Sequence, residues 1–498
     1  MKNTYLIFSV LLFLLLSACT SDSVIEDTTP STEVLIETVE TVSETIAETT
    51  EAILEEVILP EPDFSDYVYI HENERDRAWE EDVIYLAQIV LGQHPVVFED
   101  YHWIYTSKDW GQVYTAQNPF YDVTVRNSFI GEIRSLIASL PELTDREIHY
   151  EMRRIIGMLN DAHSDIQIVS GDMFPLGLKV LNVGDEAGIY VVNTPAEYSD
   201  LLYSRLVSVN EVPVKEIVLG MMNYVTSEND YLASNCAIDY RWKSVMMWTD
   251  SLRAVGVLGK DENSAIFKFL NEAEETVTLT LDAVSYDTYR DMDSASGIFT
   301  AEEYLNCEDA VQPNYWCARL TDRNVYYVRI SQFRNNEDAP FATFFNNIML
   351  ELYAVEEPQQ VIIDLRGNGG GNVLWQMVND FFGRLDGANI NGVYILMDEL
   401  SCSASVIMAC QVKNAVDDVV IVGSPAGQPP NFFTGQTYEQ LPNSGIAFSI
   451  STYFAETWKN YPYDALMPDI IIYQTLEDYT NGVDTVLEAV LDMEDNDA

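Results

Sequence analysis

The feature that most constrains the fold is a buried-strand pattern that runs straight into glycines. Val361 to Leu365 is apolar apart from Asp364, and Gly367 and Gly369 to Gly371 follow at once. From Asn324 onward such strand patterns alternate with helical spacing of apolar residues. The strands are expected at 325–330, 361–365, 393–397 and 419–422, and the helices at 341–353, at 372–382 and after residue 403. This alternation predicts an α/β core with one mainly parallel sheet.

Two other patterns precede this core. From about Arg77 to Leu159 apolar residues recur at helical spacing, as in Ile130, Ile133 and Ile137, which predicts an all-helical N-terminal segment. From about Pro175 to Ala283 the pattern changes to short alternating runs typical of strands, interrupted by a helical stretch around 214–224. We therefore expect an α+β protein of several domains.

The glycine run is a candidate binding site for negative charge. Where a strand ends and a helix begins, backbone N–H groups are exposed at the helix N-terminus and can hold an anion or an oxyanion. A nucleotide phosphate loop is excluded, because no Lys-Ser or Lys-Thr follows Gly371 and the dinucleotide spacing of glycines is absent.

A second candidate element follows the strand expected at 393–397. Ser401, Ser403 and Ser405 stand among small residues where that strand passes into an apolar helix. A serine at such a junction is exposed and has room beside its hydroxyl for a carbonyl group. Serine is also favoured as a helix cap, so the residues alone leave both interpretations open.

Together these motifs resemble those of the tail-specific (C-terminal processing) peptidase family. The order is Asp364 to Gly371, then Ser401-Cys402-Ser403-Ala404-Ser405, then Ile421 to Pro425. The resemblance extends over about 283–469. It implies a ClpP/crotonase-like core, a serine peptidase activity without metal or other cofactor, and Ser403 as nucleophile. It further implies an oxyanion site formed by the N–H groups of Gly370 and Ala404.

The resemblance also separates two choices of general base. One branch of the family uses a lysine placed 25 residues after the serine, but this position holds Gln428, which cannot act as a base. The other branch, which includes the tricorn core protease, uses a histidine in an Asp-x-His motif, and Asp161-Ala162-His163 matches it. His163 is thus the expected base, with an ordinary pKa near 6.5 that suits proton transfer in both directions.

The acid that completes the triad is assigned from a stretch near the C-terminus. The family has an acid before a Pro-Asp pair, which favours Asp464 as the residue that orients the imidazole. Because members of the tricorn branch carry a glutamate, Glu456 remains a rival.

The resemblance also suggests the domain organisation. Residues 171–285, with Pro175 to Leu178 and Leu206 to Asn210, resemble the PDZ-like domain that many members carry. The predicted organisation is an N-terminal helical domain at 67–170 carrying His163, the PDZ-like domain at 171–285 and the catalytic domain at 286–498.

The N-terminus has the pattern of a bacterial lipoprotein signal. Lys2 precedes an apolar run, and Leu16-Ser17-Ala18-Cys19 resembles a lipobox. Residues 1–18 are then a signal peptide, and a lipid on Cys19 anchors the chain to the outer face of the membrane. The alternatives are a plain secretory leader or a single membrane span, and the apolar run is shorter than the roughly 20 residues that a spanning helix needs. Residues 19–66 carry many carboxylates and predict an acidic disordered tether, or else a weak amphipathic helix.

Charge and cysteine content limit the partners. The formal net charge of −54 excludes a surface for nucleic acid or anionic lipid, since both need clustered cations. The six cysteines show no paired metal spacing, and Cys307 and Cys317 are either a loop disulfide or free thiols.

The predicted function is that of an extracytoplasmic serine endopeptidase or carboxy-terminal processing peptidase acting on peptide or protein. The rival is a catalytically inactive peptide-binding lipoprotein of the same fold. The oligomeric state and the substrate are left open.

Overall fold

The computed structural model describes residues 64–493, except 100–101, 107–112, 169–170, 240, 242–243, 306, 308–312, 337–339, 358, 372–383 and 386. The expected signal peptide, Cys19 and all but the last residues of the expected tether lie outside the described part. Within the described part, no helix combines the length and apolar character that crossing a bilayer requires.

The chain divides into two compact units, Met1–Tyr67 with Gln88–Asp122, and Val68–Ala87 with Val123–Ala498. Helix α3 (Glu74–Gln93) runs from the second unit into the first. In the first unit β1 (His102–Thr106) and β2 (Val113–Gln117) pair antiparallel. The expectation of an all-helical segment over 77–159 is therefore wrong for this stretch, which forms a hairpin between helices.

In the second unit, two helices lead toward the Asp-x-His motif. Helix α4 (Val123–Ser139) buries Ile130, Ile133 and Ile137, as the apolar spacing predicts. Helix α5 (Asp145–Gly157) begins with a capping box, in which Thr144 and Glu147 each satisfy the other's backbone N–H. The chain then turns into the short strand β3 (Asp165–Ile166), which pairs with β20 (Ala447–Ile450).

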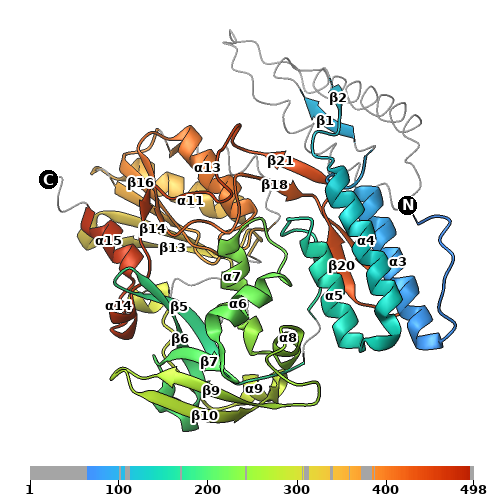
Figure 1. The fold of residues 1–498 in the computed structure, drawn as a ribbon. Coiled ribbons are helices and arrows are strands. Elements are labelled where there is room, and N and C mark those ends of the chain that lie inside the picture. The colour runs from blue at the N-terminus through green and yellow to red at the C-terminus, as the bar shows by residue number, and fades with distance from the viewer. Residues whose placement is uncertain are drawn as a thin grey trace. The chain divides into compact units, whose positions relative to one another are not determined.

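The residues expected to be PDZ-like form a β-rich part, drawn in green to yellow in Figure 1. Its sheet has the order β10-β9-β7-β6-β12, and β5 and β8 pair at its side. The strands are β5 (Gly177–Val183), β6 (Glu186–Pro195), β7 (Arg205–Val209), β8 (Val212–Pro213), β9 (Ser264–Leu270), β10 (Thr276–Asp282) and β12 (Ser294–Ser296). The helices here are α6 (Val214–Met222), α7 (Asp230–Ile238), α8 (Thr249–Ala254) and α9 (Tyr286–Asp291), and β4 (Asp172–Met173) pairs with β11 (Val284–Ser285).

The core is a six-stranded sheet of order β13-β14-β15-β16-β17-β22. Within this sheet β14, β15, β16, β17 and β22 run parallel to one another and only β13 is antiparallel, so the expectation of a mainly parallel sheet is confirmed. The bounds are β13 (Tyr315–Leu320), β14 (Val325–Ile330), β15 (Gln359–Asp364), β16 (Ile390–Met397), β17 (Val419–Gly423) and β22 (Ile470–Ile471). The four strands expected from the sequence are β14 to β17, and the helix expected at 372–382 lies outside the described residues.

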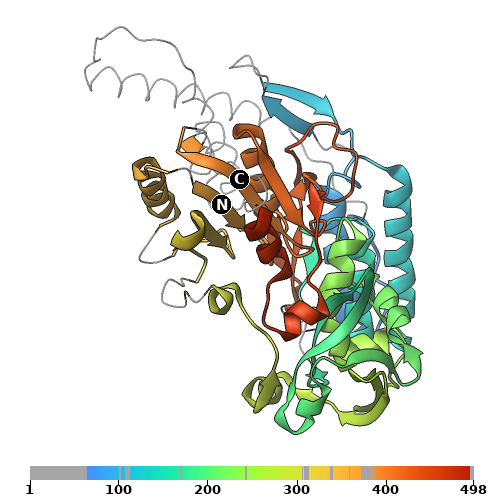
Figure 2. The same cartoon turned by 90° about the vertical axis from the view of Figure 1, so that its left-hand side faces the viewer.

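Alternating residues of these strands pack into two apolar layers. Ile363 and Ile395 face one layer together with α11 (Phe341–Ala354) and α13 (Ala404–Ala415). Ile362 and Leu396 face the other layer together with α15 (Thr485–Met493). Figure 1 shows α13 and α15 on opposite sides of the sheet, and in Figure 2 the red C-terminal helices lie in front of the orange strands. The core is therefore covered on both faces, as parallel sheets require.

Smaller elements complete the second unit. Strand β18 (Asn431–Thr434) pairs with β21 (Tyr453–Glu456), and β19 (Thr437–Gln440) pairs with β20. Helices α10 (Ala301–Tyr304) and α14 (Leu476–Thr480) lie in the connections.

A buried ionic network closes the carboxyl end of β15. Asp364 accepts hydrogen bonds from Tyr327 Oη at 2.7 Å, from Arg366 Nη2 at 2.7 Å and from Arg329 Nη1 at 3.2 Å. Arg366 also binds Asp484 Oδ1 at 2.8 Å, which ties the strand to the segment before α15. Burial alone would raise the pKa of Asp364, but the two guanidinium groups hold it below its usual range.

We predict that Asp364→Asn lowers the free energy of unfolding by about 3 kcal/mol at neutral pH, because it leaves buried guanidinium groups without their partner. Because the pKa of Asp364 is depressed in the folded state, its carboxylate contributes fully to stability above about pH 4. This contribution is lost as pH falls below the pKa of the unfolded chain and through that of the folded protein. Urea unfolding at pH 7 and pH 3 measures the loss of stability and its dependence on pH. The exposed pair of Lys268 and Glu211 is the control, since Glu211→Gln should change stability by less than about 0.5 kcal/mol. An equal loss for Asp364→Asn at both pH values would contradict the ionic role.

Candidate active site

The glycine run and the serine element meet because their strands are parallel neighbours. Strands β15 and β16 pair with Asp364 opposite Leu396, so the loops after them leave the same edge of the sheet. Asp398 joins the two loops: its Oδ1 accepts the N–H of Gly367 at 2.8 Å and its Oδ2 accepts from Arg241 Nη1 at 2.9 Å. The hydroxyl of Ser401 donates to the carbonyl of Leu365 at 3.0 Å.

Ser403 has a strained backbone conformation. Its φ is 55° and its ψ is −119°, a region that residues with a side chain rarely adopt. Its N–H donates to Gln428 Oε1 at 2.6 Å, and helix α13 begins at the next residue. Ser403 occupies the N-cap position of α13, but its side chain makes no hydrogen bond with the helix N-terminus. The hydroxyl is therefore directed away from the helix, and the interpretation of Ser403 as a simple cap does not hold.

Asn368 holds the serine element against the glycine run. Its carbonyl oxygen accepts the N–H of Cys402 at 3.0 Å and the hydroxyl of Ser405 at 2.9 Å. Its side-chain Nδ2 donates to the carbonyl of Ile330 on β14 at 2.9 Å. Asn368 is fully buried, so these bonds fix the distance between the two loops.

The structure brings His163 to Ser403. Its Nε2 lies 2.9 Å from Ser403 Oγ, across 240 residues of sequence. Its carbonyl accepts the hydroxyl of Ser449 on β20 at 2.9 Å, and its ring stacks on Phe432 with centroids 5.3 Å apart and planes 11° apart. The pairing of β3 with β20 and this stacking together set the position and the plane of the imidazole.

Asp161 supports the same histidine from two sides. Its Oδ1 accepts the backbone N–H of His163 at 2.9 Å and lies 3.9 Å from Nδ1 of the ring. Its Oδ2 accepts the hydroxyl of Ser164 at 2.5 Å. Burial lowers the pKa of His163 below its usual value, and the nearby charge of Asp161 and a hydrogen bond with the Phe433 backbone act in the opposite direction. The imidazole is thus kept neutral at neutral pH, beside a carboxylate that favours its cation.

Gln428 and Glu228 lie next to this pair. Gln428 Nε2 donates to Glu228 Oε1 at 2.6 Å and lies 3.5 Å from His163 Nδ1. Glu228 stands in the segment between α6 and α7, and sequence reasoning assigned it no role. Burial and the neighbouring charge of Asp161 raise the pKa of Glu228 well above its usual value, while the hydrogen bond from Gln428 acts in the opposite direction.

The three groups Asp161, His163 and Glu228 could in principle hold a cation, since one ligand atom of each lies within 4.8 Å of the others. However, the Gln428 amide directs a donor at Glu228 Oε1 and places the same nitrogen near His163 Nδ1. An N–H donor repels a cation, so the residues present fit an amide in this position better than a metal ion.

The assignment of the acid needs correction. Asp464 is exposed, and its backbone carbonyl accepts a hydrogen bond from Asn229 Nδ2 at 2.9 Å. Glu456 is exposed at the end of β21, opposite Asn431. Among the described residues the carboxyl groups near His163 are those of Asp161 and Glu228. The acid was expected after Ser403 in the sequence, whereas the carboxyl groups near His163 belong to residues that precede Ser403.

The oxyanion assignment needs a partial correction. Gly370 does abut the nucleophile, because a Cβ there would lie 2.6 Å from Ser403 Cβ and 3.0 Å from Ala404 N. Its own N–H, however, donates to Asn368 Oδ1 at 2.8 Å and is occupied. Ala404, as the first residue of α13, has an N–H without a partner in the helix. Gly370 was predicted to donate its N–H to the oxyanion. Instead, its lack of a side chain leaves space in front of the Ala404 N–H.

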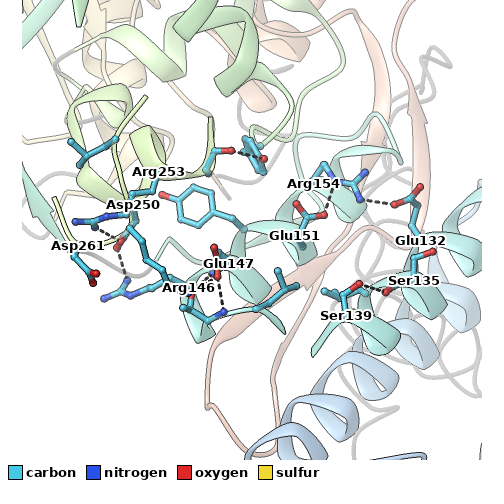
Figure 3. Close-up of a pocket in the computed structure, with 18 of the residues that line it drawn as sticks. Glu132, Ser135, Ser139, Arg146, Glu147, Glu151, Arg154, Asp250, Arg253 and Asp261 are labelled. Atoms are coloured by element: carbon cyan, nitrogen blue, oxygen red, sulfur yellow. Dashed lines mark hydrogen bonds and ion pairs between the residues drawn. The ribbon is translucent and has the colours of Figure 1, made fainter. Parts of the chain in front are cut away.

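A separate cavity of about 800 Å³ lies between α4, α5 and the segment that contains α8 (Figure 3). Its wall carries Arg154, which binds Glu132 and Glu151, and Asp250, which binds Arg146 and Arg253. Its labelled serines, Ser135 and Ser139, donate to backbone carbonyls of their own helix. The lining includes no histidine, so this cavity has no pair like that of Ser403 and His163.

We predict that Gly370→Ala lowers the rate of any reaction of Ser403 by about 100-fold or more, because the added methyl group occupies the space beside the nucleophile and φ is +99° there. Gly369→Ala is the matched control, since nothing lies within 4 Å of its Cβ position. Labelling rates with a fluorophosphonate, measured beside melting curves, test this. Equal rates for the two variants would contradict the proposed geometry.

Comparison with known proteins agrees with this site. Residues 324–381, which include β14, β15 and the glycine run, match the family model described as Peptidase family S41, and Ser403 and His163 lie outside the match. No protein of curated function matches the sequence.

Among solved structures the chain is similar to mature CPAF, with a TM-score of 0.54 and 12% identity over 84% of this chain and 96% of that one. For CPAF complexed with lactacystin the TM-score is 0.54 and the identity 13%, over 85% and 98%. The tricorn protease matches with a TM-score of 0.34 and 13% identity, over 75% and 34%. The CPAF likeness shows a common fold. The family match over the glycine run, together with this fold, supports a serine-type peptidase similar to those of family S41.

Proposed function

We propose that the chain hydrolyses peptide bonds through an acyl-enzyme on Ser403, with His163 as general base and then general acid. The observation that carries this proposal is the 2.9 Å contact between His163 Nε2 and Ser403 Oγ, at a serine whose side chain makes no capping bond. A hydroxyl held against a neutral imidazole is the arrangement that activates a serine.

The steps follow from the hydrogen bonds. The backbone of Phe433 takes part in a hydrogen bond with the His163 ring that raises its pKa, as a carbonyl acceptor does. Because Nε2 faces Ser403, Nδ1 is the nitrogen that carries the proton to this acceptor, and the Nε2 lone pair is free for the serine proton. Ser403 Oγ attacks the peptide carbonyl, and the oxyanion develops in front of the Ala404 N–H. His163 returns the proton to the leaving amine, and a water molecule repeats the sequence on the acyl-enzyme.

Asp161 is the carboxylate that stabilises the imidazolium in this mechanism. Its Oδ1 lies 3.9 Å from Nδ1, and its charge favours the protonated ring. At this distance it acts through its field, while its direct hydrogen bond goes to the His163 backbone N–H. The Asp-x-His motif thus supplies both the base and the charge that supports it.

The substrate class is an extended peptide or protein segment, bound as an added strand. The β-rich part at 171–285, whose sheet β12 (Ser294–Ser296) extends, is proposed to act as a PDZ-like domain that holds a chain end or controls access. We further propose that the chain is cleaved after residue 18, lipidated on Cys19, and held by residues 19–66 at the extracytoplasmic face of a bacterial membrane. These parts of the proposal rest on the sequence pattern at the N-terminus.

The lowered pKa of His163 predicts the pH dependence of kcat/KM. Only the neutral imidazole accepts the serine proton, so activity should fall as pH drops through a value below 6.5. Asp161→Asn keeps an oxygen for the His163 N–H but removes the charge that raises the pKa, so the acid limb should move to still lower pH. Measuring kcat/KM from pH 4 to 8 for both proteins tests this. A shift of the limb to higher pH in the variant would contradict the role given to Asp161.

The decisive experiment is labelling of the chain, cut at about residue 66, with a fluorophosphonate. Mass mapping should place the label on Ser403; Ser403→Ala should abolish it, and His163→Ala should slow it by about 1000-fold, because the hydroxyl loses its base. Asp464→Asn is the matched control and should react like the wild type, since its carboxylate is exposed. A folded wild-type protein that takes no label would instead favour the catalytically inactive peptide-binding protein.

A further inference from the structure

Gln428 joins Ser403 to a buried carboxyl group, because its side-chain amide forms hydrogen bonds with both. Its Oε1 accepts the Ser403 N–H at 2.6 Å and its Nε2 donates to Glu228 Oε1 at 2.6 Å. The side chain is fully buried. A side-chain amide has an acceptor oxygen and a donor nitrogen, so its hydrogen-bond partners determine which way the group is turned.

Glu228 is fixed by the segment around it. The next residue, Asn229, caps α7 by accepting the Leu232 N–H at 2.9 Å. Asn229 Nδ2 donates to the carbonyls of Ala426 at 3.3 Å and of Asp464 at 2.9 Å. Ala426 lies two residues before Gln428, so these bonds hold the Glu228 segment against the chain that carries Gln428. The residue expected to be the catalytic acid thus contributes through its backbone.

We infer that Gln428 and Glu228 are positioning residues for the proposed peptidase reaction: Glu228 Oε1 orients the Gln428 amide, whose Oε1 holds the Ser403 N–H and keeps the nucleophile in its strained backbone conformation. The inference rests on the proposed function. Neither residue has a hydrogen bond to the Ser403 hydroxyl: Gln428 binds the Ser403 N–H and also lies 3.5 Å from His163 Nδ1, and Glu228 acts through Gln428.

The alternative orientation of the amide shows why Glu228 matters. If the Gln428 amide were flipped, its Nε2 would face the Ser403 N–H and its Oε1 would face Glu228 Oε1, so like groups would oppose each other at both ends. A backbone N–H without its acceptor would then be left at a residue that already carries strain. The pairing with Glu228 therefore selects the orientation that supports Ser403.

The hydrogen bond also accounts for the type of side chain at position 228. The atom that faces Gln428 Nε2 must accept a hydrogen bond, and both a carboxyl oxygen and a side-chain amide oxygen can do so. The second oxygen, Oε2, is buried and has no hydrogen-bond partner in the described part of the chain. A glutamine at 228 should thus replace the glutamate, whereas an alanine should not.

The test compares four variants by kcat, KM and melting temperature. Gln428→Met keeps the size but loses both hydrogen bonds, and we expect kcat to fall by about 100-fold with KM changed by less than about 3-fold. Glu228→Ala should lower kcat by about 10-fold or more, and Glu228→Gln should restore it to within about 3-fold of the wild type. Glu216→Gln, an exposed residue on α6, is the matched control.

The double variant Gln428→Met with Glu228→Ala should be no slower than Gln428→Met alone, because the two residues act in one chain of contacts. The inference would be overturned if the double variant lost kcat by the product of the two single losses. It would also be overturned if Glu228→Gln were as slow as Glu228→Ala. A wild-type protein without activity would instead refute the proposed function.

Hydrogen exchange of the Ser403 amide tests the hydrogen bond between the Ser403 N–H and Gln428 Oε1 and does not require an activity measurement. It should be faster in Gln428→Met and in Glu228→Ala than in the wild type, and unchanged in Glu216→Gln. An unchanged exchange rate in Glu228→Ala would overturn the inference even in an inactive protein.

Discussion

The site depends on one backbone conformation, that of Ser403. A residue with a side chain at φ 55° and ψ −119° carries strain of about 1–3 kcal/mol, and it persists only where its surroundings determine it. Here the N–H of the strained residue is bound by Gln428, the N–H before it by Asn368, and helix α13 begins directly after it. These contacts direct the hydroxyl to His163 rather than to the helix end. The reactivity of the serine is therefore a property of the backbone that presents it.

The same constraint explains the use of glycine and of buried amides around the site. Gly370 is required because any side chain would enter the space of Ser403 and Ala404. Asn368 and Gln428 are uncharged, so they can be fully buried while they bind backbone groups of two loops at once. A charged residue in either place would need a partner of opposite charge to offset the cost of burial.

Sequence reasoning succeeded where function follows from neighbouring residues or from strand order. Strands β14 to β17 were visible as apolar runs, and parallel neighbours necessarily bring the loops at Gly367 and Ser403 to one edge. His163 was found because its motif is local. Glu228 was not found, because it lies in a connection between two helices and nothing nearby in sequence marks it. The acid was expected at Asp464 for the same reason: sequence gave its distance along the chain but not the direction of its carboxylate, which faces solvent.

The position of His163 has a consequence for how the protein is made. The histidine lies 240 residues before the serine, and the strand that holds its carbonyl, β20, comes later still, at Ala447–Ile450. A chain that is synthesised or exported with its N-terminus first therefore emerges with its base long before its nucleophile, and with both before the strand that aligns them. Loop closure over such a separation is slow compared with local folding. In the proposed mechanism, the pair of Ser403 and His163 is therefore assembled only when nearly all of the chain has been delivered.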